Sequence, residues 1–209
     1  MKSNRSFQFA NVLRGRMAER ILVTLLERGG YRVTRLGIEE IFDEIKLLGQ
    51  RDYLDLGLPA ALRALPDILV ADPQVSWAAL VEIKYRRRFD DEVSRELHDT
   101  LSKQREYWPE ANALVMIGEP FDSTDRFHQD YIRLIKPAET SRLLLRPLDF
   151  NMVDEREGMR RVWESLPTMA SLFKAEHLYG VDEEIARKRW DFFSNMDYIT
   201  QALKELTKF

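Results

Sequence analysis

The fold of this chain is decided by residues 66–84, which read PDILVADPQVSWAALVEIK. Two short apolar runs, residues 66–71 and 78–84, are rich in the β-branched residues that favour strands. They are separated by DPQVSW, which contains the proline and polar residues typical of a turn. The segment therefore predicts a β-hairpin.

The register of this hairpin brings three ionisable side chains together. A hairpin that turns symmetrically between Gln74 and Val75 places Asp67 directly opposite Glu82. Lys84 lies on the same face as Glu82, because side chains two residues apart in a strand share a face. The other residues of both faces are apolar, which predicts strands buried on both sides: Leu69, Ala71, Ala78 and Leu80 beside the charges, and Ile68, Val70, Val81 and Ile83 opposite.

This combination of side chains points to phosphodiester chemistry. Two carboxylates facing each other across a strand pair, with their Cβ atoms about 4.5–5.5 Å apart, repel each other, and burial increases the cost. A hard divalent cation between Asp67 and Glu82 relieves that repulsion, and Mg²⁺ keeps waters that serve as nucleophiles. Beside it, Lys84 would orient or deprotonate a water, or neutralise charge on a phosphate oxygen.

The elements around the hairpin follow in a recognisable order. Residues 9–28 have apolar residues at helical spacing, and Gly29-Gly30 marks the helix end. The other predicted elements are a strand at 31–36, helical pieces at 38–48 and 59–65 in an insertion spanning 37–65, a helix at 93–107, a strand at 113–117, edge strands at 131–135 and 143–148, and amphipathic helices at 155–174 and 182–206.

Pro66-Asp67 followed by Glu82-Ile83-Lys84, within a helix–strand–hairpin–helix–strand order, resembles the PD-(D/E)XK nuclease superfamily, which includes Holliday-junction resolvases and many restriction enzymes. The resemblance covers roughly residues 12–118. It implies an α/β fold with a restriction-endonuclease-like core, in which a central mixed β-sheet is flanked by helices. It also implies that Asp67 and Glu82 bind Mg²⁺ or Mn²⁺ and that Lys84 is the catalytic lysine.

Two further positions match the superfamily pattern. Glu19 matches a helical glutamate that many members use as a further acidic group near the metal, and Gln104 matches a glutamine near the site of some members. From the residues alone, Glu19 falls on the flank of an apolar helical stripe, where it is also a common surface residue. Gln104 takes the place of an apolar residue in its stripe, where a buried amide satisfied by the backbone is the alternative.

A basic run, Tyr85, Arg86, Arg87 and Arg88, directly follows the lysine. These residues emerge beside the expected site, where they would contact DNA phosphates. The alternative is a solvated strand end. The aromatic residues of the last third of the chain recur at helical spacing and are expected to pack in the core or an interface rather than stack on bases.

Composition limits the remaining possibilities. The 209 residues include no cysteine and only three histidines, which excludes thiolate and imidazole-rich metal sites. The formal net charge is −3, so the protein has no uniformly basic coat for nucleic acid. No apolar run approaches the roughly 18 to 20 residues of a membrane span, and the first residues lack a signal-peptide pattern, so we expect a cytoplasmic protein with no membrane contact.

These observations combine into one hypothesis. Residues 1–150 are expected to form a PD-(D/E)XK nuclease-like domain, and residues 151–209 a C-terminal helical extension that packs on the core or forms a homodimer interface. The expected activity is Mg²⁺- or Mn²⁺-dependent hydrolysis of DNA by an endonuclease. The alternative is a catalytically inactive nuclease-fold subunit that binds DNA or another protein.

Overall fold

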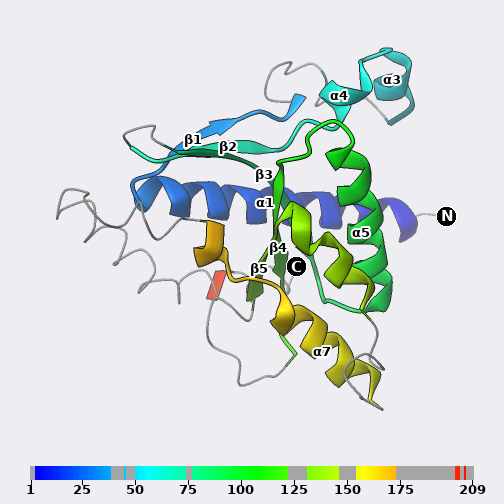
Figure 1. The fold of residues 1–209 in the computed structure, drawn as a ribbon. Coiled ribbons are helices and arrows are strands. Elements are labelled where there is room, and N and C mark those ends of the chain that lie inside the picture. Colours follow the sequence, from blue (N-terminus) through cyan, green and yellow to red (C-terminus); the bar gives the residue numbers. More distant parts are fainter. Residues whose placement is uncertain are drawn as a thin grey trace.

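The computed structural model describes residues 3–38, 45, 50–73, 77–121, 131–145, 154–172, 201, 202 and 205. A five-stranded mixed sheet, in the order β1-β2-β3-β4-β5, stands between helices on its two faces, as Figure 1 shows. Only the β3–β4 pair is parallel, and the other pairs are antiparallel. The strands are β1 (Arg32–Arg35), β2 (Ile68–Ala71), β3 (Ala78–Arg86), β4 (Asn112–Ile117) and β5 (Ile132–Ile135). The expected α/β class with a mixed sheet is therefore confirmed.

The described helices differ widely in length. They are α1 (Ser3–Arg28), α3 (Gln50–Asp55), α4 (Ala60–Arg63), α5 (Asp91–Arg105) and α7 (Glu155–Ser165), with 3₁₀ segments η2 (Pro137–Leu144) and η4 (Met169–Leu172). The helix expected at 38–48 falls almost entirely outside the described residues, and so does most of the helix expected at 182–206. Among the described helices, none combines the length and apolar character needed to cross a membrane.

The hairpin has the predicted register. Ile68 pairs with Val81, and the pairing continues to Ala71 opposite Ala78. The backbone N–H of Asp72 donates to the carbonyl of Trp77 at 3.1 Å, which extends the same register toward the turn. Asp67 therefore stands one residue before β2 at the level of Glu82.

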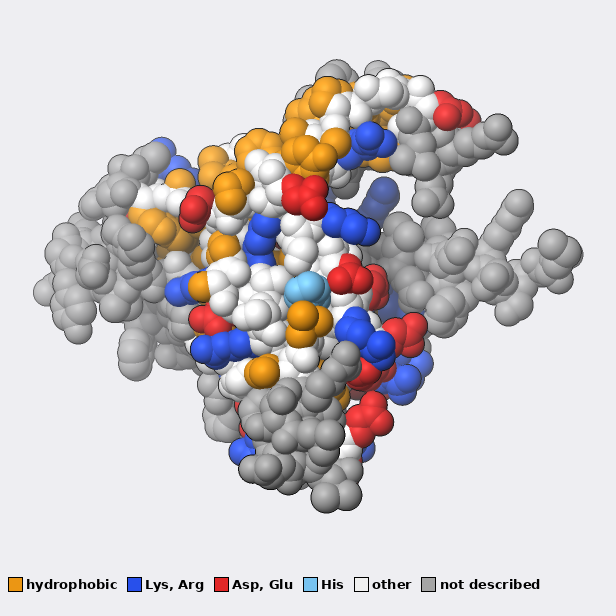
Figure 2. All heavy atoms as spheres, turned by 45° about the vertical axis from the view of Figure 1, so that its right-hand side comes forward, with side chains coloured by type: hydrophobic (Ala, Val, Ile, Leu, Met, Phe, Trp, Pro, Cys, Tyr) orange, Lys and Arg blue, Asp and Glu red, His pale blue; other side chains and the backbone are white. Residues whose placement is uncertain are grey.

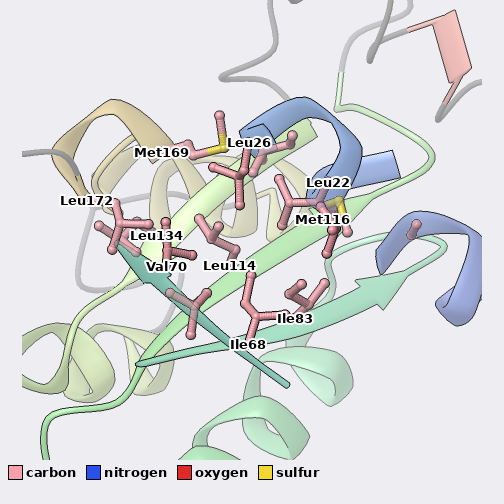
Figure 3. Close-up of a cluster of buried hydrophobic side chains, with 14 of the residues drawn as sticks. Leu22, Leu26, Ile68, Val70, Ile83, Leu114, Met116, Leu134, Met169 and Leu172 are labelled. Carbon is pink, nitrogen blue, oxygen red and sulfur yellow. The ribbon is translucent and has the colours of Figure 1, made fainter. Parts of the chain in front are cut away.

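One face of the sheet is sealed by α1. Leu22 and Leu26 of this helix are fully buried in a cluster with Ile68, Ile83 and Leu114, part of which Figure 3 shows. Each such side chain contributes about 1.5–3 kcal/mol on burial. The helix ends where Gly30 adopts a φ of +82°, and the Tyr31 N–H then donates to the Leu26 carbonyl at 3.0 Å, which turns the chain into β1.

The other face is covered mainly over β4 and β5. A second apolar cluster joins α5, η2 and α7 to the outward side chains of these strands; it contains Leu97, Leu101, Val115, Ile135, Leu143, Val162 and Trp163. The Asp90 side chain accepts from Val93 N at 3.0 Å and so begins α5. Together these contacts place the C-terminal half of α5 beside the middle of β3.

Three sequence predictions are wrong in part. Residues 143 and 144 belong to η2 and not to a strand, because Pro137 starts a 3₁₀ helix and buried Leu143 packs under α5; residues 146–148 lie outside the described part. The helix expected at 155–174 ends at Ser165, before Pro167, and η4 follows. The hairpin was expected to be buried on both faces, but only the face that packs against α1 is well buried. On the other face Ala78 is exposed, and Leu69 and Leu80 are half-buried.

Candidate active site

Asp67 is fixed by the backbone of the neighbouring strand. The N–H of Ile83 donates to Oδ2 of Asp67 at 2.6 Å, and the Leu36 N–H donates to the Asp67 carbonyl at 2.8 Å. The chain enters β2 directly after Asp67, where its carboxylate takes a backbone donor of β3. Its position in the sheet thus follows from the hairpin register.

Glu82 lies in the middle of β3 and is shared between two donors. Its Oε1 accepts from Nζ of Lys84, and its Oε2 accepts from Nε2 of Gln104 at 2.6 Å. Glu82 and Gln104 are only 7% and 8% exposed. The structure therefore brings together four of the residues selected from the sequence: Asp67 before β2, Glu82 and Lys84 from β3, and Gln104 from α5.

Gln104 also reaches the segment that leads into Asp67. Its Nε2 donates to the Ala64 carbonyl at 3.2 Å as well as to Glu82. One helical turn further on, Nε1 of Trp108 donates to the Ala61 carbonyl at 3.0 Å. Gln104, near the end of α5, and Trp108, three residues beyond that end, thus hold the segment formed by α4 and Ala64, which ends three residues before Asp67 in the chain.

Burial is the main influence on Asp67. The pKa of its carboxyl is raised from 3.8 to about 7, chiefly because burial removes it from water and next because of the nearby charge of Glu82. Lys84 and the Ile83 hydrogen bond act in the opposite direction without cancelling these effects. The repulsion expected between the two carboxylates is present, but it ranks behind burial as the cause.

Lys84 is held in its charged form. Burial alone would lower its pKa, but the neighbouring charges of Glu82 and Asp67 and the hydrogen bond to Glu82 outweigh it, so the pKa of Lys84 is raised. A lysine with a raised pKa keeps its proton, and such a group is better suited to neutralise negative charge than to act as a general base.

Glu19 approaches the cluster from α1. This half-buried carboxylate has an electrostatic effect on Asp67, where it is the last of the influences that raise the pKa. Its side chain also has further interactions within the protein. Glu19 is therefore close enough to the site to influence the charge state of Asp67.

The basic run after Lys84 divides between two faces. Tyr85 packs against the α1 cluster, on the side of the sheet opposite Lys84. Each arginine pairs with a carboxylate: Arg86 with Glu96 at 2.7 Å, Arg87 with Glu119 at 2.5 Å, and Arg88 with Asp90 at 2.9 Å. In Figure 2, basic and acidic side chains alternate over the face shown, and hydrophobic side chains gather at the top, where Figure 1 places α3 and α4. The structure therefore does not assemble these four residues into one free basic patch.

The donors available to a metal ion at this site are the carboxylates of Asp67 and Glu82. No group of three or more His, Cys, Asp or Glu side chains in the described part of the chain is arranged to hold one. Mg²⁺, however, is commonly held by one or two carboxylates and completes its shell with water and substrate phosphate. Asp67 and Glu82 supply two such oxygen donors, and the charge of Glu82 is the second cause, after burial, of the raised pKa of Asp67. On this donor chemistry the pair fits Mg²⁺ or Mn²⁺.

A cavity of about 760 Å³ lies elsewhere, at the beginnings of α5 and α7. Its lining includes Phe89, Phe121 and Met159, together with charged residues such as Arg88 and Glu155. None of the four clustered residues lines it. The carboxylates instead lie on the hairpin face on which Leu69 and Leu80 are half-buried and Ala78 is exposed.

Sequence reasoning missed the Ala64 carbonyl and Trp108. A backbone acceptor has no sequence signature, but Trp108 stands at helical spacing four residues after Gln104, a signal that could have pointed to it even though α5 itself ends at Arg105. Comparison of the chain with known protein families, curated proteins and solved structures finds no match.

Proposed function

We propose that this protein is a Mg²⁺- or Mn²⁺-dependent endonuclease that hydrolyses phosphodiester bonds in DNA. The observation that carries the proposal is the convergence of Asp67, Glu82 and Lys84 beside a half-open sheet face, in the hairpin register that the sequence predicts. An isolated ion pair on the surface contributes little to the free energy of unfolding. A buried charged group, by contrast, needs partners that compensate for its lost hydration. A site that binds a cation and a phosphate accounts for all three groups together.

The fold supports the same proposal. Its order of helix, strand, hairpin, helix and strand, with the acidic pair on the central hairpin, is compatible with the restriction-endonuclease-like core that the sequence resemblance implies. We therefore propose membership of the PD-(D/E)XK nuclease superfamily for the region of residues 12–118. Because one fold serves many functions, the activity is argued from the site itself.

Each residue then has a distinct role. Asp67 and Glu82 would hold the cation, and Glu19 would add negative charge at the edge of the site. When bound, such a cation supplies Lewis-acid activation of water and of the phosphate. Lys84 is an ammonium that neutralises charge developing on a phosphate oxygen. Gln104 orients Glu82 rather than the lysine, since its amide donates to Oε2.

Nicking of a supercoiled plasmid tests the proposal directly. The parent should nick DNA in Mg²⁺ or Mn²⁺ and lose activity in EDTA, while Asp67→Asn and Lys84→Met should be nearly inactive. Asp99→Asn is the matched control, because this carboxylate of α5 is exposed and pairs only locally with His98 among the contacts shown. Equal nicking by parent and Asp67→Asn would refute the proposal.

A second candidate is a catalytically inactive nuclease-fold subunit that binds DNA or a protein. The observation in its favour is that Lys84 already neutralises Glu82, and that Arg86, Arg87 and Arg88 are each paired with a carboxylate. This candidate requires no cation at Asp67. A parent protein that binds DNA equally with and without Mg²⁺, and that never nicks it, would favour the second function over the first.

A further inference from the structure

The two oxygens of Glu82 have donors of different kinds. Oε2 accepts from the neutral amide of Gln104, which is itself tied to the Ala64 carbonyl. Oε1 accepts from the ammonium of Lys84. One oxygen of the proposed metal ligand is therefore held by a fixed neutral group, and the other by a charged group at the end of a flexible side chain.

Lys84 can leave Glu82 more easily than Gln104 can. The Lys84 side chain is 24% exposed, whereas that of Glu82 is 9% exposed, so water reaches the ammonium from the open side of the hairpin. Gln104 is buried, and both of its N–H bonds are used within the protein. Rotation of the lysine therefore needs no change in the backbone, while loss of the glutamine contact would free α4 as well.

We propose that Lys84 is the resident counter-cation of Glu82, and that a divalent cation enters the site by displacing the Lys84 ammonium from Oε1 while Gln104 keeps the carboxylate in place. This inference rests on the proposed function, because it concerns the metal site of that activity. A divalent cation and an ammonium on the same oxygen repel each other, so binding of the cation weakens the contact of Lys84 with Oε1. Metal entry thus releases Lys84 toward the substrate.

If the cation displaces Lys84 from Oε1 of Glu82, the lysine competes with the metal for this oxygen. Removal of the lysine charge should then raise the affinity for the metal. Replacing Lys84 with Met keeps most of the side-chain length and removes the competing charge. In the parent, Mn²⁺ must replace the hydrogen bond between the two charged groups Lys84 and Glu82, and in the variant it does not. We therefore expect Mn²⁺ to bind Lys84→Met roughly tenfold more tightly than the parent. Isothermal titration calorimetry with MnCl₂, in the absence of DNA, measures this affinity without reference to activity.

The matched control for charge is Arg86→Met. Arg86 lies two residues along β3 on the same face, but it pairs with Glu96 and not with Glu82. Loss of one positive charge near the site is common to both variants, whereas loss of the contact with Oε1 is specific to Lys84→Met. A gain for Lys84→Met with little change for Arg86→Met supports exchange. An equal gain for both, or no gain for Lys84→Met, overturns it.

Gln104 is a positioning residue in this scheme. Gln104→Met should weaken Mn²⁺ binding, because it releases Oε2 of Glu82. Trp108→Phe is its matched control, since it removes the other hydrogen bond between α5 and α4 and leaves Glu82 untouched. Weaker binding for Gln104→Met alone supports the assignment, and equal weakening by both variants overturns it in favour of a general effect on α4.

Failure of the inference is distinguishable from failure of the proposed function. A parent that binds Mn²⁺ and loses binding in Asp67→Asn, but gains nothing in Lys84→Met, keeps the metal site and rejects the exchange. A parent that binds no Mn²⁺ at millimolar concentration, with circular dichroism confirming that it is folded, rejects both. Each variant is compared with the parent by circular dichroism before titration.

Discussion

The substitution Asp67→Asn tests whether the carboxylate of Asp67 binds a metal ion or only stabilises the fold. Asn keeps the shape of Asp and can still accept the Ile83 N–H hydrogen bond through its amide oxygen. What it removes is an ionised group in a buried position beside Glu82. Without metal, we therefore expect the variant to be at least as stable as the parent at neutral and alkaline pH.

The magnitude follows from the pKa. The pKa of Asp67 rises from 3.8 to about 7 in the native protein, and each unit of pKa difference corresponds to about 1.4 kcal/mol. Ionised Asp67 therefore lowers the free energy of unfolding by at most about 4 kcal/mol at pH 8. Because water enters from the open face and the Asn amide must itself be accommodated, we expect a net gain of about 1–2 kcal/mol for the variant.

The sign gives this effect a characteristic pH profile. The pKa of Asp67 is higher in the native state than in the unfolded state, so the native state binds this proton more firmly. The stability that the bound proton contributes is fully present below about pH 4 and is lost as the pH rises to about 7. Parent and variant should therefore be nearly equal in stability at about pH 4 and below. The variant should become progressively more stable than the parent between about pH 4 and pH 7, and the difference should level off above that.

Thermal melts in EDTA and in Mg²⁺ or Mn²⁺ provide the assay. At this chain length 1 kcal/mol corresponds to roughly 2–4 °C in Tm. The cation should raise the Tm of the parent, because a ligand that binds only the native state stabilises it, and should barely affect the variant. A variant that is less stable than the parent at pH 8, with the same response to metal as the parent, would refute the reasoning and make Asp67 a structural residue.

Three further predictions concern the site and the end of the chain. Ca²⁺ should raise the Tm of the parent without supporting plasmid nicking, because its looser coordination organises the attacking water less well; nicking in Ca²⁺ at the Mg²⁺ rate would contradict this. Gln104→Met should cost about 1–3 kcal/mol in urea unfolding, since it leaves Oε2 of Glu82 and the Ala64 carbonyl without their donor. Deletion of residues 182–209, which the sequence predicts to be an amphipathic helix, should lower the Tm or abolish a dimer in size-exclusion chromatography; an unchanged Tm in a protein that is monomeric before and after would reject the idea.

The hairpin was predictable because two independent signals agree in it. The turn residues between the apolar runs set the centre of the hairpin, and the alternation of side chains sets the faces. A shift by one residue would have exposed Ile68 and Ile83 and buried other residues in their place, so the apolar pattern fixes Asp67 opposite Glu82. Alternation also assigns Tyr85 to the face of Ile83, away from Lys84, so the sequence pattern itself separates Tyr85 from the site.

Other features could not be read from the sequence, because they depend on contacts between distant residues. Arg87 pairs with Glu119, which is brought near only when β3 and β4 align in parallel. Ala64 meets Gln104 across 40 positions of the chain. Hydrophobic periodicity indicates which face of a helix or strand is buried, but it does not identify the element that packs against that face.

Polarity in an apolar pattern was the most informative local signal. Gln104 continues the buried stripe of Leu97 and Leu101, where an apolar side chain would pack without cost, so its amide needed partners. The structure supplies them in Glu82 and the Ala64 carbonyl, and thereby combines the two earlier alternatives: the amide is satisfied by backbone and also holds a site residue. The same reasoning does not apply to Glu19. Its side chain is half-buried on α1, so it needs a hydrogen-bond partner less than a fully buried polar group does.

The charge balance of the cluster decides which experiment is informative. Glu82 and Lys84 form an ion pair, and Asp67, with a pKa of about 7, carries a proton over much of the acidic range. The metal-free cluster is then nearly neutral below pH 7, so a protein with no cation can bury these three groups at a tolerable cost. The presence of buried charges therefore does not by itself demand a metal. Above pH 7 Asp67 adds a negative charge to the cluster, which a bound cation would neutralise. Metal-dependent stability at alkaline pH therefore distinguishes a metal site from a self-neutralised one.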